Sequence, residues 1–133
     1  MTELITYPMN YGNHYARIHK KCQAELKDLV DQSGHKGAFM AKFIDRLNYL
    51  MAHYERAVQH REWFESLQGS KDLYSMRFIR IDNIRILYTI RKPKVYLLCA
   101  FKEVSDKKGG ESYQKYIPIA MKRMNETLEE ESE

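Results

Sequence analysis

Apolar residues in the first half of the chain recur every three or four positions, which is the spacing of helices that bury one face. The pattern runs through 22–30 and again through 39–58, and residues 33–37 separate the two segments with a Ser-Gly pair. Such a pair after a periodic segment is typical of a helix end. We therefore predict two successive helices, the second from about residue 36 to 54, that form a helical hairpin.

After residue 73 the apolar period changes to two, which is typical of strands with one buried face. Two turn signals interrupt the alternation, so the pattern predicts three strands, at 73–81, 84–91 and 95–102. Short turns between consecutive strands favour an antiparallel meander with one face on the helices and the other in water. Strict alternation along the third strand places four side chains on one of its faces: Val95, Leu97, Cys99 and Phe101.

The two ends of the chain have less regular patterns. Residues 1–14 form an N-terminal extension without a sustained period, and residues 15–19 fit either a first strand or the start of a helix. A polar loop is expected at 105–110, and a last helix should start near Tyr116 so that Pro118 lies in its first turn. Helices followed by a sheet and a helix indicate a single α+β domain over all 133 residues.

The composition is that of a globular domain, with 44% hydrophobic and 30% charged residues. No apolar run approaches the roughly 20 residues that span a bilayer, and the first residues lack the basic and apolar regions of a signal peptide. We therefore expect a cytoplasmic protein with no membrane segment. In that compartment Cys22 and Cys99 should stay reduced, and a disulfide between them is the alternative.

The net charge of +4 conceals two regions of opposite sign. Five glutamates form an acidic tail at 126–133, while residues 1–125 carry 22 basic and 13 acidic side chains, a net charge of +9. Between residues 71 and 108 there are ten Lys or Arg and four Asp or Glu. A basic body of this kind attracts polyanions through their phosphates. The alternative is a solvated basic surface without a partner.

No standard catalytic or metal-binding motif is present. The chain has no glycine-rich nucleotide loop, no zinc-protease motif and no His or Cys spacing that favours a metal. We therefore expect neither a metal nor a small-molecule cofactor.

The candidate chemistry is basic and aromatic. Arg77 and Arg85 lie on the more polar side of strands about 4.8 Å apart, so their guanidinium groups could converge on one phosphate. The ten tyrosines offer surfaces on which unpaired bases could stack. The alternative is that the arginines pair with surface carboxylates across the strands.

Several segments between 67 and 123 occur in a recognisable order. They are Leu67-Gln68-Gly69, Leu73-Tyr74-Ser75-Met76-Arg77, Ile84-Arg85-Ile86-Leu87-Tyr88, Val95-Tyr96-Leu97-Leu98-Cys99-Ala100-Phe101-Lys102 and Tyr116-Ile117-Pro118-Ile119-Ala120-Met121-Lys122-Arg123. In this order they resemble the signature of the RelE/ParE toxin superfamily, and most closely its HigB-like, phage-derived branch. That signature has Leu-Tyr-Glu-Leu-Arg in its first strand, which Leu73-Tyr74-Ser75-Met76-Arg77 resembles here. It ends on Phe-Lys-Lys, where this chain has Glu103 in place of the second lysine.

The resemblance implies a RelE-like fold and a toxin of a type II toxin–antitoxin pair, which cleaves mRNA on the ribosome without a metal. It implies that Arg85 lies at the scissile phosphate, and that a catalytic tyrosine falls near Tyr113 or Tyr116. The partners would be a cognate antitoxin, the ribosome and mRNA. We assign catalytic roles to Arg85, Arg77, Lys102 and Tyr116, and RNA contacts to Arg91, Lys94 and Tyr113.

Two alternatives differ from a nuclease in class. A ParE-like protein would inhibit DNA gyrase and cleave nothing, and Glu103 in place of the second lysine slightly favours it. An inactive RelE fold would act as a scaffold or regulator, and the extension at 1–14 and the acidic tail leave room for that. The acidic tail could also shield the basic groove of its own chain.

Overall fold

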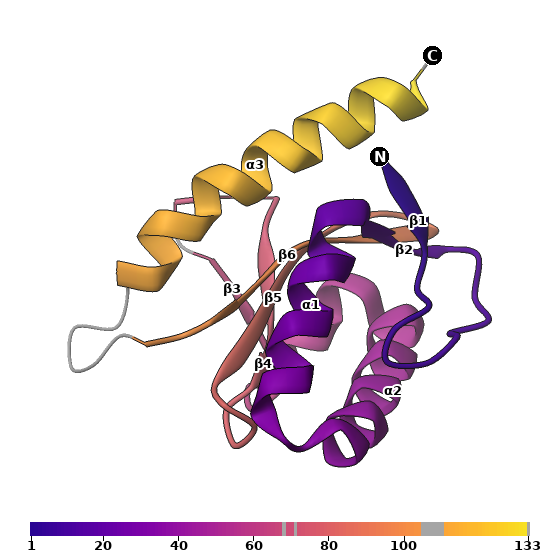
Figure 1. Ribbon diagram of the computed structural model, residues 1–133. Coiled ribbons are helices and arrows are strands. Elements are labelled where there is room, and N and C mark those ends of the chain that lie inside the picture. Colours follow the sequence, from indigo (N-terminus) through magenta and orange to yellow (C-terminus); the bar gives the residue numbers. More distant parts are fainter. Residues whose placement is uncertain (68, 71, 105–110, 133) are drawn as a thin grey trace.

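The computed structural model describes residues 1–67, 69–70, 72–104 and 111–132 (Figure 1). The polar loop expected at 105–110 and the last residue of the acidic tail lie outside them. A six-stranded mixed sheet, in the order β1-β2-β6-β5-β4-β3, forms the centre of the fold. Its strands are β1 Thr2–Leu4, β2 Ala16–His19, β3 Phe64–Ser66, β4 Tyr74–Phe78, β5 Ile84–Arg91 and β6 Lys94–Lys102. Neighbouring strands are antiparallel except β2 and β6, which are parallel.

Three α-helices and one short 3₁₀ helix, η1, complete the described part: α1 Lys20–Ser33, α2 Lys36–His53, η1 Tyr54–Gln59 and α3 Glu111–Glu131. The α+β class is therefore confirmed. In α1 the imidazole of His19 accepts a hydrogen bond from the Lys21 N–H, and Gly34 ends the helix in the left-handed region, with φ of +74°. None of the helices described is long and apolar enough to cross a membrane.

The undecided segment at 15–19 forms a strand, β2. Its backbone pairs with β1 on one side and with β6 on the other, and the side chains of Ala16 and Ile18 are buried in the core. Pairing on both sides satisfies the backbone hydrogen bonds that a helical turn would otherwise make. The helix therefore begins only at Lys20.

Neither face of strands β5 and β6 is left to water. The core on one face contains the apolar sides of α1 and α2, and α3 covers the other face (Figure 1), where Ala120 and Met124 pack with Leu87 and Phe101. The expectation of one wet face was wrong. Its physical reason is that β5 and β6 carry apolar side chains on both faces, which is typical of strands covered on both sides.

A β-bulge in β6 breaks the expected alternation. Leu87 lies opposite Cys99 whereas Tyr88 lies opposite Leu97, so that Leu98 is an extra residue in β6. An extra residue reverses which face the following side chains point to. The four side chains expected on one face are therefore divided between the two cores: Val95 and Leu97 on the side of α1 and α2, Cys99 and Phe101 on the side of α3.

Helix α3 begins at Glu111, five residues before the start expected at Tyr116, and Pro118 lies inside it. Proline cannot donate to the carbonyl four residues earlier, which here belongs to Gln114. Both residues are exposed, so water can hydrate this carbonyl and the helix continues.

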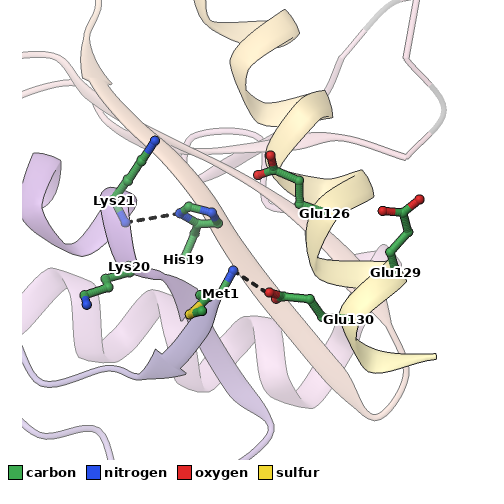
Figure 2. Close-up of a pocket in the computed structure, with 7 residues that line it drawn as sticks. All are labelled: Met1, His19, Lys20, Lys21, Glu126, Glu129 and Glu130. Carbon is green, nitrogen blue, oxygen red and sulfur yellow. Dashed lines mark hydrogen bonds and ion pairs between the residues drawn. The ribbon is translucent and has the colours of Figure 1, made fainter. Parts of the chain in front are cut away.

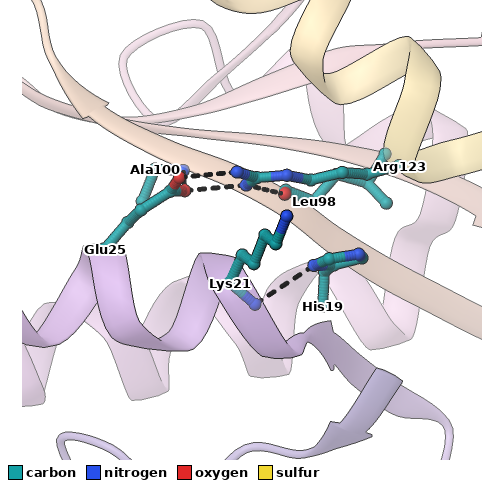
Figure 3. Close-up of polar contacts among 6 residues, drawn as sticks. All are labelled: His19, Lys21, Glu25, Leu98, Ala100 and Arg123. Carbon is teal, nitrogen blue, oxygen red and sulfur yellow. Dashed lines mark hydrogen bonds and ion pairs between the residues drawn. The ribbon is translucent and has the colours of Figure 1, made fainter. Parts of the chain in front are cut away.

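An ion pair covers the edge of β6 where β2 ends (Figure 3). The guanidinium of Arg123 on α3 donates to both carboxylate oxygens of Glu25 on α1, at 2.9 and 2.7 Å. Arg123 also donates to the Leu98 carbonyl at 2.9 Å, and Glu25 accepts from the Ala100 N–H at 3.1 Å. The pair therefore satisfies backbone groups that a neighbouring strand would bond, and it joins α1 to α3.

Candidate functional site

Arg77 and Arg85 are direct cross-strand neighbours, since Arg77 on β4 pairs with Arg85 on β5 in the sheet register. Directly opposite residues point to the same face of a sheet. That face is the one covered by α3, because Phe101, the β6 partner of Arg85, belongs to the core that α3 covers. The structure thus brings the two arginines together as their positions in the sequence predicted.

The hydroxyl of Tyr113 on α3 connects Arg85 to side chains of β3 and β4. It accepts a hydrogen bond from Arg85 Nε at 3.1 Å and donates one to Glu65 Oε1 on β3 at 3.1 Å. It also lies 3.0 Å from Ser75 Oγ on β4. Burial raises the pKa of Tyr113 above its usual value, so the hydroxyl keeps its proton at neutral pH. We call these five residues the arginine–tyrosine cluster: Glu65, Ser75, Arg77, Arg85 and Tyr113.

Arg85 is buried, with 7% of its surface exposed, and is not the solvent-facing arginine that a wet face predicted. The first turns of α3 cover it. Within the described residues its guanidinium donates to Tyr113 and, at 3.4 Å, to the Ile84 carbonyl. These contacts hold the guanidinium in one orientation.

Arg77 is half-buried and has spare donor capacity. Its Nη1 donates to the Arg61 carbonyl at 3.2 Å, whereas its Nε is buried without a hydrogen-bond partner in the part of the chain that the structure describes. Such an unpaired donor costs about 1–3 kcal/mol. A groove of about 280 Å³ beside β3 is lined by both Arg77 and Glu65. An acceptor that enters there could satisfy the guanidinium.

Tyr116 and Lys102 lie outside the cluster. The Tyr116 ring stacks on Phe101 with centroids 4.4 Å apart, and Tyr113 meets Phe101 edge-on from 5.4 Å. Lys102 pairs with Ile84, which is the neighbour of Arg85 on β5. Successive residues of a strand point to opposite faces, so the Lys102 side chain lies on the opposite face of the sheet from Arg85. It pairs with Asp82 at 3.9 Å. Both Tyr116 and Lys102 line a separate groove of about 610 Å³ between α1 and the start of α3.

Arg91 and Lys94 lie at the opposite end of the β5–β6 hairpin, where they face each other across the two strands. Arg91 is six positions beyond Arg85, which is about 20 Å along a strand. Its Nη2 is 3.8 Å from Asp72, and Lys94 Nζ is 2.9 Å from Glu131. These two predicted RNA contacts are therefore remote from the arginine–tyrosine cluster.

The acidic tail packs against the first residues of the chain. In Figure 2 the amino group of Met1 points toward Glu130, at 3.0 Å, and in the same helix Glu131 accepts from the Tyr96 hydroxyl at 2.6 Å. Hydrogen bonds from Tyr96 and Lys94 lower the pKa of Glu131. The tail neutralises Lys94 and the amino terminus at one end of the molecule. The cluster around Arg85 lies at the other end of β5.

Two members of the cluster, Glu65 and Ser75, were not predicted from the sequence. Strand β3 has only three residues, too few for alternation to mark Glu65 as a site residue. Ser75 stands where the RelE-type signature has glutamate, and Glu65 is its direct partner in the register. The departure at Ser75 was the one available signal that another strand supplies a carboxylate.

The cluster combines two guanidinium groups, a protonated hydroxyl and a carboxylate, which together can bind an oxyanion and transfer a proton. Among the described residues no three His, Cys, Asp or Glu side chains are grouped so as to hold a metal ion. Comparison with known proteins gives no match to this chain, neither to a family model nor to a curated protein or a solved structure.

Proposed function

We propose that this chain is a toxin of the RelE/ParE type, HigB-like, that cleaves mRNA on the ribosome without a metal ion. It would act in the cytoplasm and be held inactive by a cognate antitoxin. The observation that carries the proposal is the pairing of Arg77 with Arg85 beneath the Tyr113 hydroxyl. The order of the motifs between residues 67 and 123 supports the same assignment.

The proposal includes a RelE-like arrangement of a helical hairpin on an antiparallel meander with a C-terminal helix. Two pairings support it, since β4 is antiparallel to β5 and β5 is antiparallel to β6. The signature has a glutamate at the position of Ser75. In this chain Glu65 could take its place, because Glu65 lies directly opposite Ser75 in the sheet register.

The chemistry of RNA cleavage needs only groups of this kind. The 2′-oxygen attacks the phosphorus as its bond to the 5′-oxygen breaks, which leaves a 2′,3′-cyclic phosphate and a free 5′-hydroxyl. Arg85 and Arg77 would stabilise the charge on the phosphate oxygens. Glu65 would accept the proton of the 2′-hydroxyl, and Tyr113 would donate its proton to the 5′-oxygen. The geometry favours Tyr113 over Tyr116 and Lys102 because only Tyr113 contacts Arg85.

A member of the same fold without nuclease activity is the second candidate. Arg85 is 7% exposed and bonded within its own chain, as a purely structural arginine would be. In that case the protein would inhibit DNA gyrase, as ParE-type toxins do, or act as a scaffold.

Induction of the protein in a bacterium separates these functions. We expect growth to stop and ribosome-bound mRNA to be cut within coding regions, and co-expression of the neighbouring gene from the native operon should restore growth. Growth arrest with DNA damage and intact mRNA would favour gyrase inhibition instead. Normal growth with intact mRNA would favour the scaffold.

A further inference from the structure

A second cationic pocket lies on the α2 side of the sheet, away from the arginine–tyrosine cluster. It has a volume of about 280 Å³, and its charged lining consists of Lys42, Arg46, Glu62 and Arg80. Three of these four side chains are positive. Lys42 and Arg80 are exposed, whereas Arg46 is only 6% exposed.

The Arg46 guanidinium is fixed between two aromatic rings. Its central carbon lies 4.7 Å from the ring centroid of Trp63 and 4.7 Å from that of Phe78. Trp63 is in turn stacked on His60, with centroids 3.9 Å apart and planes 15° from parallel. Arg46 Nε donates to the Arg77 carbonyl at 3.0 Å, and its Nη1 donates to the Lys42 carbonyl at 3.4 Å. The guanidinium is thus held in place by stacking and by two backbone acceptors.

No carboxylate in the described part of the chain forms an ion pair with Arg46. Asp45 and Glu62 act on it only from beyond ion-pair distance, and burial lowers its pKa to about 10. Buried charges in proteins are usually paired, because an unpaired one has lost its hydration without compensation. Lys42 and Arg80 add charge of the same sign, and Glu62 is the one carboxylate among the lining residues, so positive charges outnumber negative charges in the lining by two.

We propose that this pocket binds a phosphate group, carried either by an RNA strand or by a small phosphorylated molecule. A guanidinium fork matches phosphate oxygens, and two further cations suit the charge of a phosphate better than that of one carboxylate. The volume is at the lower end for ligand pockets, which fits a phosphate with its adjoining sugar. Arg46 and His60 already stack on the Trp63 indole. The indole therefore contributes an apolar wall to the pocket and offers no free surface on which a base could stack.

Binding of a labelled single-stranded RNA at several salt concentrations tests the proposal in the full chain. Lys42→Ala and Arg80→Ala change exposed side chains and should leave the fold intact. Each should weaken binding by about 5- to 10-fold and reduce the slope of log affinity against log salt by about 0.7, the value for one phosphate contact on a single strand. Lys122→Ala, an exposed charge on α3, is the matched control and should leave the slope unchanged.

Arg46→Lys tests the buried cation itself, because an ammonium keeps the charge but loses the fork. We expect a weaker affinity than in either surface variant, with thermal unfolding measured to verify that the protein is folded. Inorganic phosphate should compete with the RNA for the wild type and less well for Arg46→Lys. Binding of phosphate without RNA would identify a small phosphorylated molecule as the source.

Two results would overturn the phosphate site. One is a loss of affinity in Lys122→Ala equal to that in Lys42→Ala and Arg80→Ala. The other is binding of an acidic peptide at this pocket, lost in the same variants, with neither RNA nor phosphate bound. Because the test measures binding without ribosomes, its outcome is independent of whether the protein cleaves mRNA.

Discussion

Tyr113 is the residue on which the candidate site most depends, because its hydroxyl contacts side chains from three strands. A buried hydroxyl with three partners cannot be removed without leaving some of them unpaired. The same atom is the proposed proton donor. Its contribution to stability and its contribution to cleavage can be separated, because the free energy of unfolding and the cleavage rate are measured independently.

We predict that Tyr113→Phe lowers mRNA cleavage by roughly 10²-fold or more, the usual contribution of a general acid. The free energy of unfolding should fall by about 1–3 kcal/mol, because Arg85 Nε and Ser75 Oγ lose a buried partner. Cleavage assays and chemical denaturation measure the two effects. Tyr116→Phe, which keeps its stack on Phe101, should cost less cleavage. The opposite order would move the role to Tyr116.

The elements that could be predicted from the sequence are those with enough residues to show a period. Helix α2 was expected at 36–54 and is found at Lys36–His53, and the segment at 84–91 forms β5 over the same residues. Strands β1 and β3 have three residues each, too few for alternation to be visible. The bulge at Leu98 could not be seen either, because Leu98 and Cys99 are both apolar and fit either face.

The candidate site could also be predicted only in part from the sequence. Arg77 and Arg85 were placed together because alternation and register are local properties of neighbouring strands. The burial of Arg85 was not predicted, since it depends on α3, which is distant in sequence and whose start was expected near Tyr116. Glu65 was missed for the same kind of reason, because only the pairing of β3 with β4 brings it to Ser75.

Packing of α3 should depend on the ion pair between Glu25 and Arg123. We predict that Arg123→Ala lowers the free energy of unfolding by about 2 kcal/mol. This loss is smaller than the roughly 3–5 kcal/mol expected when one partner of a fully buried ion pair is removed, because the Glu25 side chain remains 31% exposed. Denaturant unfolding measures the change. Lys27→Ala removes one partner of an exposed pair on α1 and is the control, with little effect expected. Equal stability of the two variants would show that the edge of β6 does not need this pair.

At the scale of the whole molecule, charge is divided between a basic body and an acidic end. The tail neutralises Lys94 and the amino terminus. The pKa of Glu131 is lowered, so its contacts stabilise the fold above about pH 4.5 and are lost as the pH falls through the lowered value. The contacts of the described tail residues therefore lie at the end of the molecule that holds Lys94 and the amino terminus.

We predict that Glu131→Gln combined with Glu130→Gln strengthens binding of single-stranded RNA, because Lys94 is released to contact a phosphate. The salt slope should steepen by about 0.7. Glutamine and glutamate have similar helix propensities, so α3 should persist. Glu126→Gln combined with Glu129→Gln, which changes two exposed carboxylates of the same helix, serves as the control with the same net charge. If both variants bind RNA equally, Lys94 is not an RNA contact.

Cleavage of ribosome-bound mRNA by Arg85→Ala, compared with the wild type and with Arg85→Lys, tests the proposed nuclease most directly. We predict a loss of roughly 10²-fold or more in Arg85→Ala, as when one preorganised charge donor is removed, and partial recovery in Arg85→Lys. Because Arg85 is buried and hydrogen-bonded, both variants should also lose about 1–3 kcal/mol of stability, so rates are compared at a temperature where each is folded. A folded Arg85→Ala protein that cuts mRNA at the wild-type rate would show that Arg85 has no catalytic role.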